Sequence, residues 1–218
     1  MSSNRGLFIT FEGGEGAGKS SQIKRFATYL ESKHETVVLT REPGATETGR
    51  EIRKLLVEGN KDKFDEITEV LLFYADRRIN LTKIVFPALN EGKIVLSDRF
   101  NDSTVAYQYY GAAKFKDTAI LDTLYNLVAP NFKPDLTFLL DIDVKAGLKR
   151  SFAKAATMAT KELRFENAET AFHERLRQGY LEMVKKEPER FRIIDAAPDE
   201  DTVFKAIVNA YNDFMAKR

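Results

Sequence analysis

The chain has 218 residues, with 34 Lys and Arg against 33 Asp and Glu and no cysteine. A net charge of +1 gives no overall basic field for nucleic acid or an anionic membrane, and without cysteine there is no disulfide, thiolate nucleophile or zinc–cysteine site. The length suits one α/β domain over residues 1–218, and with no signal-like N-terminus and no run of about 18 apolar residues we expect a soluble, cytoplasmic protein.

Short apolar runs alternate with longer helical patterns along the chain, as in a parallel sheet covered by helices. The expected strands are residues 7–11, 36–40, 94–98, 136–141 and 191–194. Helices are expected to begin near Gly18, Thr48, Asp65, Ser103, Lys116, Val144, Arg164 and Asp199. The pattern therefore predicts an α/β fold with a five-stranded parallel sheet flanked by helices.

A glycine-rich motif directly follows the first expected strand. It reads Gly13-Gly14-Glu15-Gly16-Ala17-Gly18-Lys19-Ser20, with Ser21 after it, and matches the G-x-x-x-x-G-K-[ST] pattern of a phosphate-binding loop. Glycines let backbone N–H groups point at phosphate oxygens, and the following helix adds the positive end of its dipole. Lys19 is expected to reach the β and γ phosphates and Ser20 to hold Mg²⁺. The motif predicts a P-loop NTPase-type fold that binds ATP and Mg²⁺; the alternative is a flexible glycine-rich turn.

The helical pattern over residues 69–78 places Phe73 and Arg77 on one face, because they are four residues apart. The ring could stack on a flat base while the guanidinium bonds to the edge of that base. The alternative is a core Phe beside a surface Arg, and the spacing alone favours this alternative.

The third expected strand ends in Asp98-Arg99. In a phosphate-binding site, a carboxylate at the carboxyl end of a buried strand often contacts Mg²⁺, and Asp98 is in such a position. The alternative is that Asp98 and Arg99 form a structural ion pair. In the next helix, Ser103 pairs with Tyr107 and Thr104 with Gln108 at i,i+4, either as a pocket wall or as helix caps.

Other features carry less information. The guanine-reading N-K-x-D motif of GTPases is only partly matched at residues 60–63, where Lys63 replaces the Asp, so we interpret it as coincidence. Residues 151–163 lack a clean apolar stripe and predict either a mobile lid or a frayed helix end. His34 and His173 have no Ser–His–Asp arrangement around them, so hydrolase chemistry has little support and we expect both at the surface.

Together these segments resemble the thymidylate kinase family, the ATP-dependent kinases of deoxythymidine monophosphate (dTMP), along nearly the entire chain. The matching segments are Phe11-Glu12-Gly13 before the loop, Thr40-Arg41-Glu42-Pro43-Gly44, Leu72-Phe73-Tyr74-Ala75-Asp76-Arg77, Asp98-Arg99-Phe100, Ser103-Thr104, Ala106-Tyr107-Gln108, Pro134-Asp135-Leu136-Thr137 and Leu139-Leu140-Asp141. The glycine-rich loop is common to many nucleotide-binding proteins, whereas the combination of the other segments is much more specific.

The resemblance implies transfer of the ATP γ-phosphoryl group to dTMP, giving dTDP for dTTP synthesis. It assigns acceptor binding to Glu15, Arg41, Pro43, Phe73, Arg77, Arg99, Ser103, Thr104, Tyr107 and Gln108. In the family pattern thymine stacks on Phe73 and bonds to Arg77, while Arg99 clamps the acceptor phosphate with help from Arg41. Tyr107 leaves little space for a ribose 2′-hydroxyl, and Glu15 faces the acceptor's sugar. Thr104 and Gln108 line the base edge.

The resemblance also implies the catalytic groups. These are Lys19, Asp98, Arg99 and a cation from a lid over approximately residues 150–165, with Ser20 and Asp98 on the Mg²⁺. The lid cation is open among Arg150, Lys154 and Arg164, and we favour Arg164 for its Arg-x-Glu spacing. Ala45 replaces a glycine of the family pattern, which could shift that loop. The family commonly forms homodimers through helices, and we expect that here.

Two rival functions remain open. Another P-loop kinase could act on a different base or on a free 5′-hydroxyl, which would need a general base such as Glu12 or Glu15. A nucleotide-binding regulatory protein would keep ATP without turnover, but such a protein has no use for the acceptor-side Arg99.

Overall fold

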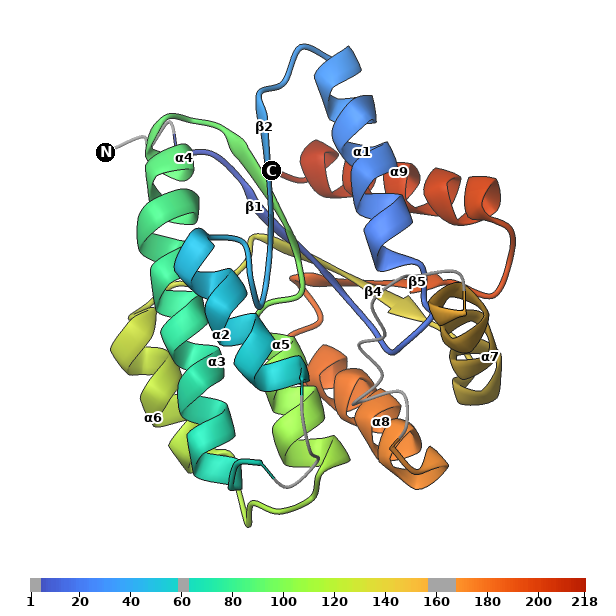
Figure 1. The fold of residues 1–218 in the computed structure, drawn as a ribbon. Helices are drawn as coiled ribbons and strands as arrows, with labels where there is room; N and C mark the ends of the chain where they lie inside the picture. The colour runs from blue at the N-terminus through green and yellow to red at the C-terminus, as the bar shows by residue number, and fades with distance from the viewer. Residues whose placement is uncertain (1–4, 59–62, 157–167) are drawn as a thin grey trace.

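The computed structural model describes residues 5–58, 63–156 and 168–218, which form a parallel sheet with helices on both faces (Figure 1). The strands are β1 (Phe8–Glu12), β2 (Val37–Arg41), β3 (Ile94–Asp98), β4 (Leu136–Asp141) and β5 (Phe191–Asp195). Their order in the sheet is β2-β3-β1-β4-β5, and every neighbouring pair is parallel. The predicted five-stranded α/β fold is therefore confirmed.

The helices follow the expected alternation. They are α1 (Lys19–Ser32), α2 (Glu47–Val57), α3 (Glu66–Asn80), η1 (Leu81–Val85), α4 (Phe86–Asn90), α5 (Asn101–Thr104), η2 (Val105–Gly111), α6 (Ala119–Val128), α7 (Val144–Ala155), α8 (Thr170–Lys186) and α9 (Glu200–Ala216). Segments η1 and η2 are π-helical turns that continue α3 and α5. Within the described ranges, no helix is both long enough and apolar enough to cross a bilayer.

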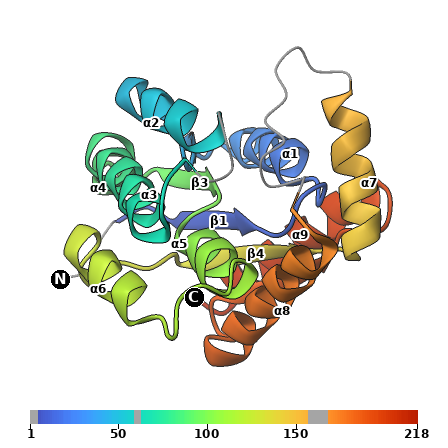
Figure 2. The same ribbon diagram turned by 60° about the horizontal axis from the view of Figure 1, so that its bottom comes forward.

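Alternate side chains of the buried strands face two separate cores. Ile9 and Phe11 of β1 pack with α1 and α9 on one face, while Phe8 packs with η1 and α4 on the other. On that second face the helix formed by α5 and η2 lies beside α8 in both views (Figure 1 and Figure 2). These layers hold the carboxyl ends of the strands in fixed positions.

The strand register brings several predicted site residues to one edge of the sheet. Asp98 at the end of β3 is aligned with Phe11 of β1 and with Arg41 of β2. The loop after β1 and the turn after β3 therefore leave the sheet side by side. Ligands of open α/β sheets bind at such a carboxyl edge.

Some expectations differ from the structure or lie outside it. No helix start is expected from the sequence between Asp65 and Ser103, whereas the structure has η1 and α4 there, with Pro87 at the start of α4 directly after the π-helical turn η1. Residues 60–62 of the partial N-K-x-D match, the helix start near Arg164 and most of the expected lid lie outside the described residues. The single domain over 1–218 stays a prediction.

Candidate active site

The loop between β1 and α1 depends on glycine. Gly13, Gly16 and Gly18 have φ angles of 139°, 69° and 87°, where a Cβ is disfavoured. A Cβ on Gly16 would also lie 1.9 Å from the carbonyl oxygen of Gly147, so α7 runs directly against the loop. Residues 15–22 line a cavity of about 1950 Å³ at the start of α1. The loop thus offers a helix N-terminus to an anion, as the motif predicts.

Lys19 and Ser20 occupy the first turn of α1. The Lys19 ammonium donates to the carbonyl oxygens of Gly13 and Gly14, at 2.9 and 2.8 Å. Burial, together with the charge of Arg99, lowers the pKa of Lys19 to about 8. The Ser20 hydroxyl donates to the Asp98 carboxylate at 2.8 Å, which brings the two predicted metal ligands together.

This Ser20–Asp98 pair fits Mg²⁺ by the nature of its donors. Mg²⁺ prefers oxygen ligands and is usually held by one or two protein groups together with phosphates and water. Within the described residues, no group of three or more His, Cys, Asp or Glu side chains is arranged to hold a metal. A Mg²⁺ ion held by Ser20 and Asp98 would therefore share its coordination with phosphate oxygens.

Arg99 lies at the junction of the loop and the turn after β3. Its guanidinium donates to the Gly13 carbonyl at 3.2 Å, to the Ser103 hydroxyl at 3.1 Å and to the Glu15 carboxylate at 3.1 Å. The guanidinium also lies 4.8 Å from the centre of the Tyr107 ring. One side chain thus contacts both the glycine-rich loop and the helix after β3.

The Glu15 carboxylate lies between Arg99 and Tyr107. It accepts hydrogen bonds from Arg99 and from the Tyr107 hydroxyl. Burial raises the pKa of Glu15, but the charges of Arg99 and Lys19 and the Tyr107 hydrogen bond outweigh burial and hold the pKa below its ordinary value. Glu15 is therefore an ionised acceptor at neutral pH.

A second cavity of about 740 Å³ adjoins the first. Its lining comprises Glu15, Glu42, Pro43, Arg53, Val57, Phe73, Arg77, Arg99, Phe100, Ser103, Thr104, Tyr107 and Gln108. All the residues predicted to bind the acceptor line this cavity except Arg41, which lines the larger one. The two cavities share Glu15, Glu42, Arg53 and Arg99, so they form one continuous site with these residues at the boundary.

Arg77 is 1 % exposed, so the alternative of a surface arginine is wrong. Its guanidinium donates to Glu42 at 2.8 Å, to Asn101 at 3.1 Å and to Thr104 at 3.0 Å. These bonds use three of the five N–H groups of an arginine. The guanidinium is thus fixed at the wall of the second cavity, one helical turn from Phe73.

Sequence reasoning did not single out Glu42, Arg53 and Asn101. Glu42 and Asn101 bind Arg77 from separate segments, and nothing in their local sequence shows this. Arg53 lies on α2, donates to the Pro43 carbonyl at 3.1 Å and lines both cavities. A single Arg in a charged helix carries no distinctive local signal.

Three other expectations have clear outcomes. Arg150 of α7 donates to the carbonyl oxygens of Ala196 and Ala197, both at 2.6 Å, while Arg164 and the Lys154 side chain lie outside the described residues. Ser21 lines the larger cavity, but its hydroxyl donates to Glu200 at 3.1 Å. His34 is exposed as expected, whereas the surface prediction for His173 is wrong. His173 is buried because it stands on the same face of α8 as Leu176 and Tyr180.

Glu12 and Glu15 have different surroundings although they are three residues apart. Glu12 is fully buried and lines neither of the two adjoining cavities, whereas Glu15 lines both. A free hydroxyl acceptor would need a general base. Glu15 is ionised, but its lowered pKa makes it a weaker base than an ordinary glutamate. Neither carboxylate is therefore well suited to activate a hydroxyl.

Comparison with known proteins gives consistent results. The family model described as "Thymidylate kinase" matches residues 11–207. A thymidylate kinase of Desulfovibrio desulfuricans is 44 % identical over 210 residues, covering 94 % of this chain and 96 % of that protein. One of Caulobacter vibrioides is 44 % identical over 203 residues, covering 93 % and 94 %. The crystal structure of thymidylate kinase from Ehrlichia chaffeensis superposes with a TM-score of 0.76 at 34 % identity, over 95 % of this chain and 99 % of that one.

Proposed function

The chain belongs to the thymidylate kinase family, and we propose that its two adjoining cavities carry out that family's reaction: ATP bound in the larger transfers its γ-phosphoryl group to dTMP bound in the smaller. The products are ADP and dTDP, a precursor of dTTP. The observation that supports this most strongly is Arg99, which bonds to the Gly13 carbonyl of the glycine-rich loop and to Ser103 and Glu15 of the second cavity. A guanidinium in that position can neutralise both phosphates that must approach each other.

The smaller cavity suits a thymine nucleotide. Phe73 offers a ring for stacking, and Arg77 has two N–H groups beyond its three protein bonds for the carbonyl oxygens of the base. Gln108 donates its amide N–H to Glu69 at 3.1 Å, which leaves its carbonyl oxygen to accept the N3–H of thymine. Tyr107 is held against Glu15, and its ring restricts the sugar side of the cavity.

The larger cavity suits ATP. The N–H groups at the start of α1 and the Lys19 ammonium would bind phosphate oxygens, and Ser20 with Asp98 would hold Mg²⁺. Bound there, Mg²⁺ would neutralise charge on the β and γ phosphates. Arg41 lies on this side, so we propose that it acts near the junction rather than on the base or sugar of dTMP.

The chemistry needs positioning more than proton transfer. The acceptor phosphate has a second pKa near 6, so at neutral pH it is mostly a dianion and already a nucleophile. What opposes the reaction is repulsion between this dianion and the γ-phosphate. Lys19 and Arg99 reduce the repulsion, hold the two groups in line and stabilise charge on the transferring group. The boundary residue Arg53 supplies a further positive charge.

Of the three candidates for the lid cation, Arg150, Lys154 and Arg164, we propose Arg164 for its Arg-x-Glu spacing, and the guanidinium of Arg150 is already bonded to two carbonyl oxygens. We also propose a cytoplasmic homodimer. Exposed apolar side chains on the adjacent helices α2 and α3, namely Leu55, Ile67 and Leu71, support such an interface. Sedimentation of the purified chain at twice the monomer mass tests it.

An Arg99→Lys variant tests the proposed role of Arg99 at the boundary of the two cavities. Lysine keeps the charge but cannot make the three separate contacts of the guanidinium, so we expect kcat with ATP and dTMP to fall by about a hundredfold. The matched control is Arg78→Lys, an exposed arginine on α3 that donates to the Val128 carbonyl at 2.8 Å. Normal kcat in Arg99→Lys, at an unchanged circular dichroism spectrum, would contradict the proposal.

A further inference from the structure

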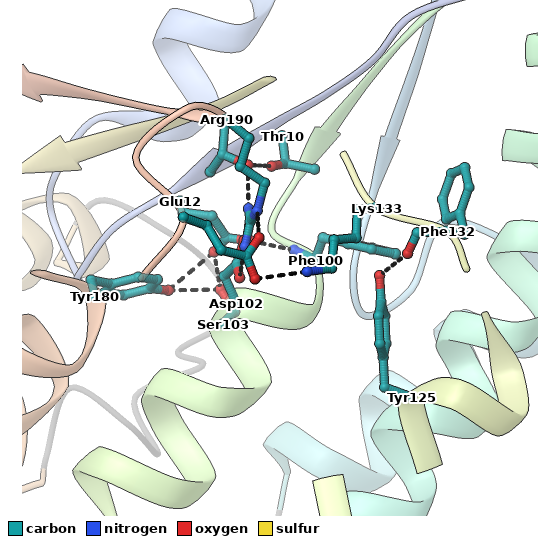
Figure 3. Close-up of polar contacts among 12 residues, drawn as sticks. Thr10, Glu12, Phe100, Asp102, Ser103, Tyr125, Phe132, Lys133, Tyr180 and Arg190 are labelled. Atoms are coloured by element: carbon teal, nitrogen blue, oxygen red, sulfur yellow. Dashed lines mark hydrogen bonds and ion pairs between the residues drawn. The ribbon is translucent and has the colours of Figure 1, made fainter. Parts of the chain in front are cut away.

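The buried carboxylate of Glu12 lines neither substrate cavity. It lies at the end of β1, is 0 % exposed and is surrounded by groups from three other segments (Figure 3). Within the described residues, no Lys or Arg donates a hydrogen bond to it, so it is not half of a structural ion pair. Burying a carboxylate in this way costs stability. The groups around Glu12 indicate the function that this carboxylate has.

All the hydrogen-bond partners of Glu12 are donors. One oxygen accepts the backbone N–H of Phe100 at 2.7 Å, and the other accepts the Ser103 hydroxyl at 2.5 Å and the Tyr180 hydroxyl at 3.1 Å. Figure 3 shows these groups converging on the carboxylate from the turn after β3, from α5 and from α8. Phe100 immediately follows Arg99, and Ser103 is one helical turn beyond it.

The direction of these bonds leads from Arg99 to Glu12. An arginine N–H can only donate, so the Arg99 guanidinium, 3.1 Å from the Ser103 oxygen, uses that oxygen as an acceptor. The Ser103 hydroxyl has one proton and lies 2.5 Å from Glu12 and 2.9 Å from the Tyr180 hydroxyl; its shorter contact is the bond to Glu12, to which Tyr180 also donates. The series of hydrogen bonds from Arg99 through Ser103 therefore ends on Glu12, whose carboxylate accepts the last bond.

Glu12 also fixes the backbone beside Arg99. Arg99 has a φ of 71°, a left-handed conformation that costs energy for any residue with a Cβ. Its N–H donates to the Phe11 carbonyl at 3.0 Å and its carbonyl accepts from the Ser97 hydroxyl at 2.7 Å. The Phe100 N–H bond to Glu12 secures the peptide group that follows.

We propose that Glu12 is a positioning residue for Arg99: through the Ser103 hydroxyl and the Phe100 amide it holds the guanidinium at the boundary of the two cavities. It acts through Arg99 and touches neither substrate. The charged and titratable groups that face it are Asp102, Arg99, Lys19 and Tyr180. The proposal rests on the role of Arg99 proposed above.

A neighbouring carboxylate provides the matched control. Asp102 is also buried, but it pairs with both terminal nitrogens of Arg190 at 2.7 Å (Figure 3). Asp102 and Arg99 both lie within the described residues, and no hydrogen bond joins them. Glu12→Gln and Asp102→Asn each replace a buried carboxylate by an amide of the same shape, and in each the amide NH2 group faces donors from which the carboxylate had accepted, so both will lower the melting temperature. Only Glu12→Gln puts an amide where Ser103 and Phe100 need an acceptor.

The decisive experiment measures kcat of each carboxylate variant in the wild-type and in the Arg99→Lys background, with ATP and dTMP, below the melting transition. We expect Glu12→Gln to lower kcat by about tenfold to a hundredfold in the wild-type background and to add no loss once Arg99 is lysine. Asp102→Asn should keep kcat within about threefold in both backgrounds. If Glu12→Gln does not fold, Ser103→Ala is measured in the same two backgrounds, with the same expectation.

An equal loss from Glu12→Gln in both backgrounds, or no loss in the wild-type background, would overturn the positioning role. Normal turnover by Arg99→Lys alone would instead contradict the function proposed for Arg99 at the boundary of the two cavities. The two failures are therefore distinguishable.

Discussion

The contact between the phosphate loop and α7 makes Gly147→Ala an informative variant. Gly147 is a buried helix residue, and in an ordinary helix Gly→Ala stabilises a protein by about 1 kcal/mol. Here the new Cβ would lie 2.5 Å from the carbonyl oxygen of Glu15 and 3.1 Å from a methyl group of Ile142, whereas ordinary contact begins at 3.4 Å. The loop backbone must therefore yield by most of an ångström.

The magnitude follows from two opposing terms. Overpacking of this kind costs about 1–3 kcal/mol, which offsets or exceeds the helix-propensity gain of about 1 kcal/mol. We expect net destabilisation of up to about 2 kcal/mol, measured by urea unfolding. Because Glu15 moves relative to Arg99 and Tyr107, we expect kcat/KM for both substrates to fall by about tenfold to a hundredfold.

Ala146→Gly, at the neighbouring exposed position of α7, calibrates the propensity term. It should cost up to about 1 kcal/mol and leave the kinetics unchanged. A Gly147→Ala variant that is more stable than wild type by about 1 kcal/mol, with normal kinetics, would refute the close contact between α7 and the loop.

Three further predictions concern the two cavities and the buried carboxylate. Phe73→Ala should raise the KM for dTMP by about tenfold or more through lost stacking while the KM for ATP stays within about twofold; equal weakening of both would mean that Phe73 is structural. Ser20→Ala should raise the Mg²⁺ concentration for half-maximal rate by about tenfold, and Ser21→Ala, whose hydroxyl bonds to Glu200, should not; equal effects would contradict the metal assignment. Burial raises the pKa of Glu12 to about 8, and the pKa of Lys19 is also about 8, so the ratio of wild-type kcat to Glu12→Gln kcat isolates Glu12 and should rise with pH through a limb near 8. Wild-type stability should fall as the pH rises from about 4.5 to 8, because the folded protein binds the extra proton there; a kcat ratio that does not change with pH would contradict this.

The sequence predicted those parts of the site that depend on local spacing. Glycine positions before Lys19 and Ser20 fix a phosphate loop, and a carboxylate at a strand end must reach the same edge of the sheet, so the Ser20–Asp98 contact follows from two short motifs. The strands were found because all five are short apolar runs between turn signals, and β1 is buried along its whole length.

Long-range contacts were not predictable in the same way. Glu12 and Glu15 are close in sequence, but the hydrogen-bond partners of Glu12 are distant, and the Tyr180 hydroxyl from α8 lies 168 residues further along the chain. Arg77 reads as a surface residue by spacing, yet Glu42, 35 residues before it, holds it in the wall of a cavity. Such tertiary partners override local propensity and leave no local pattern.

The measurement that tests the central claim most directly is ADP release with ATP and Mg²⁺ in the presence of each deoxynucleoside monophosphate, and of thymidine, in turn. The two joined cavities predict rapid turnover with dTMP and little with thymidine, because thymidine lacks the phosphate that Arg99 would bind. No turnover with dTMP beside rapid turnover of another acceptor would contradict the account.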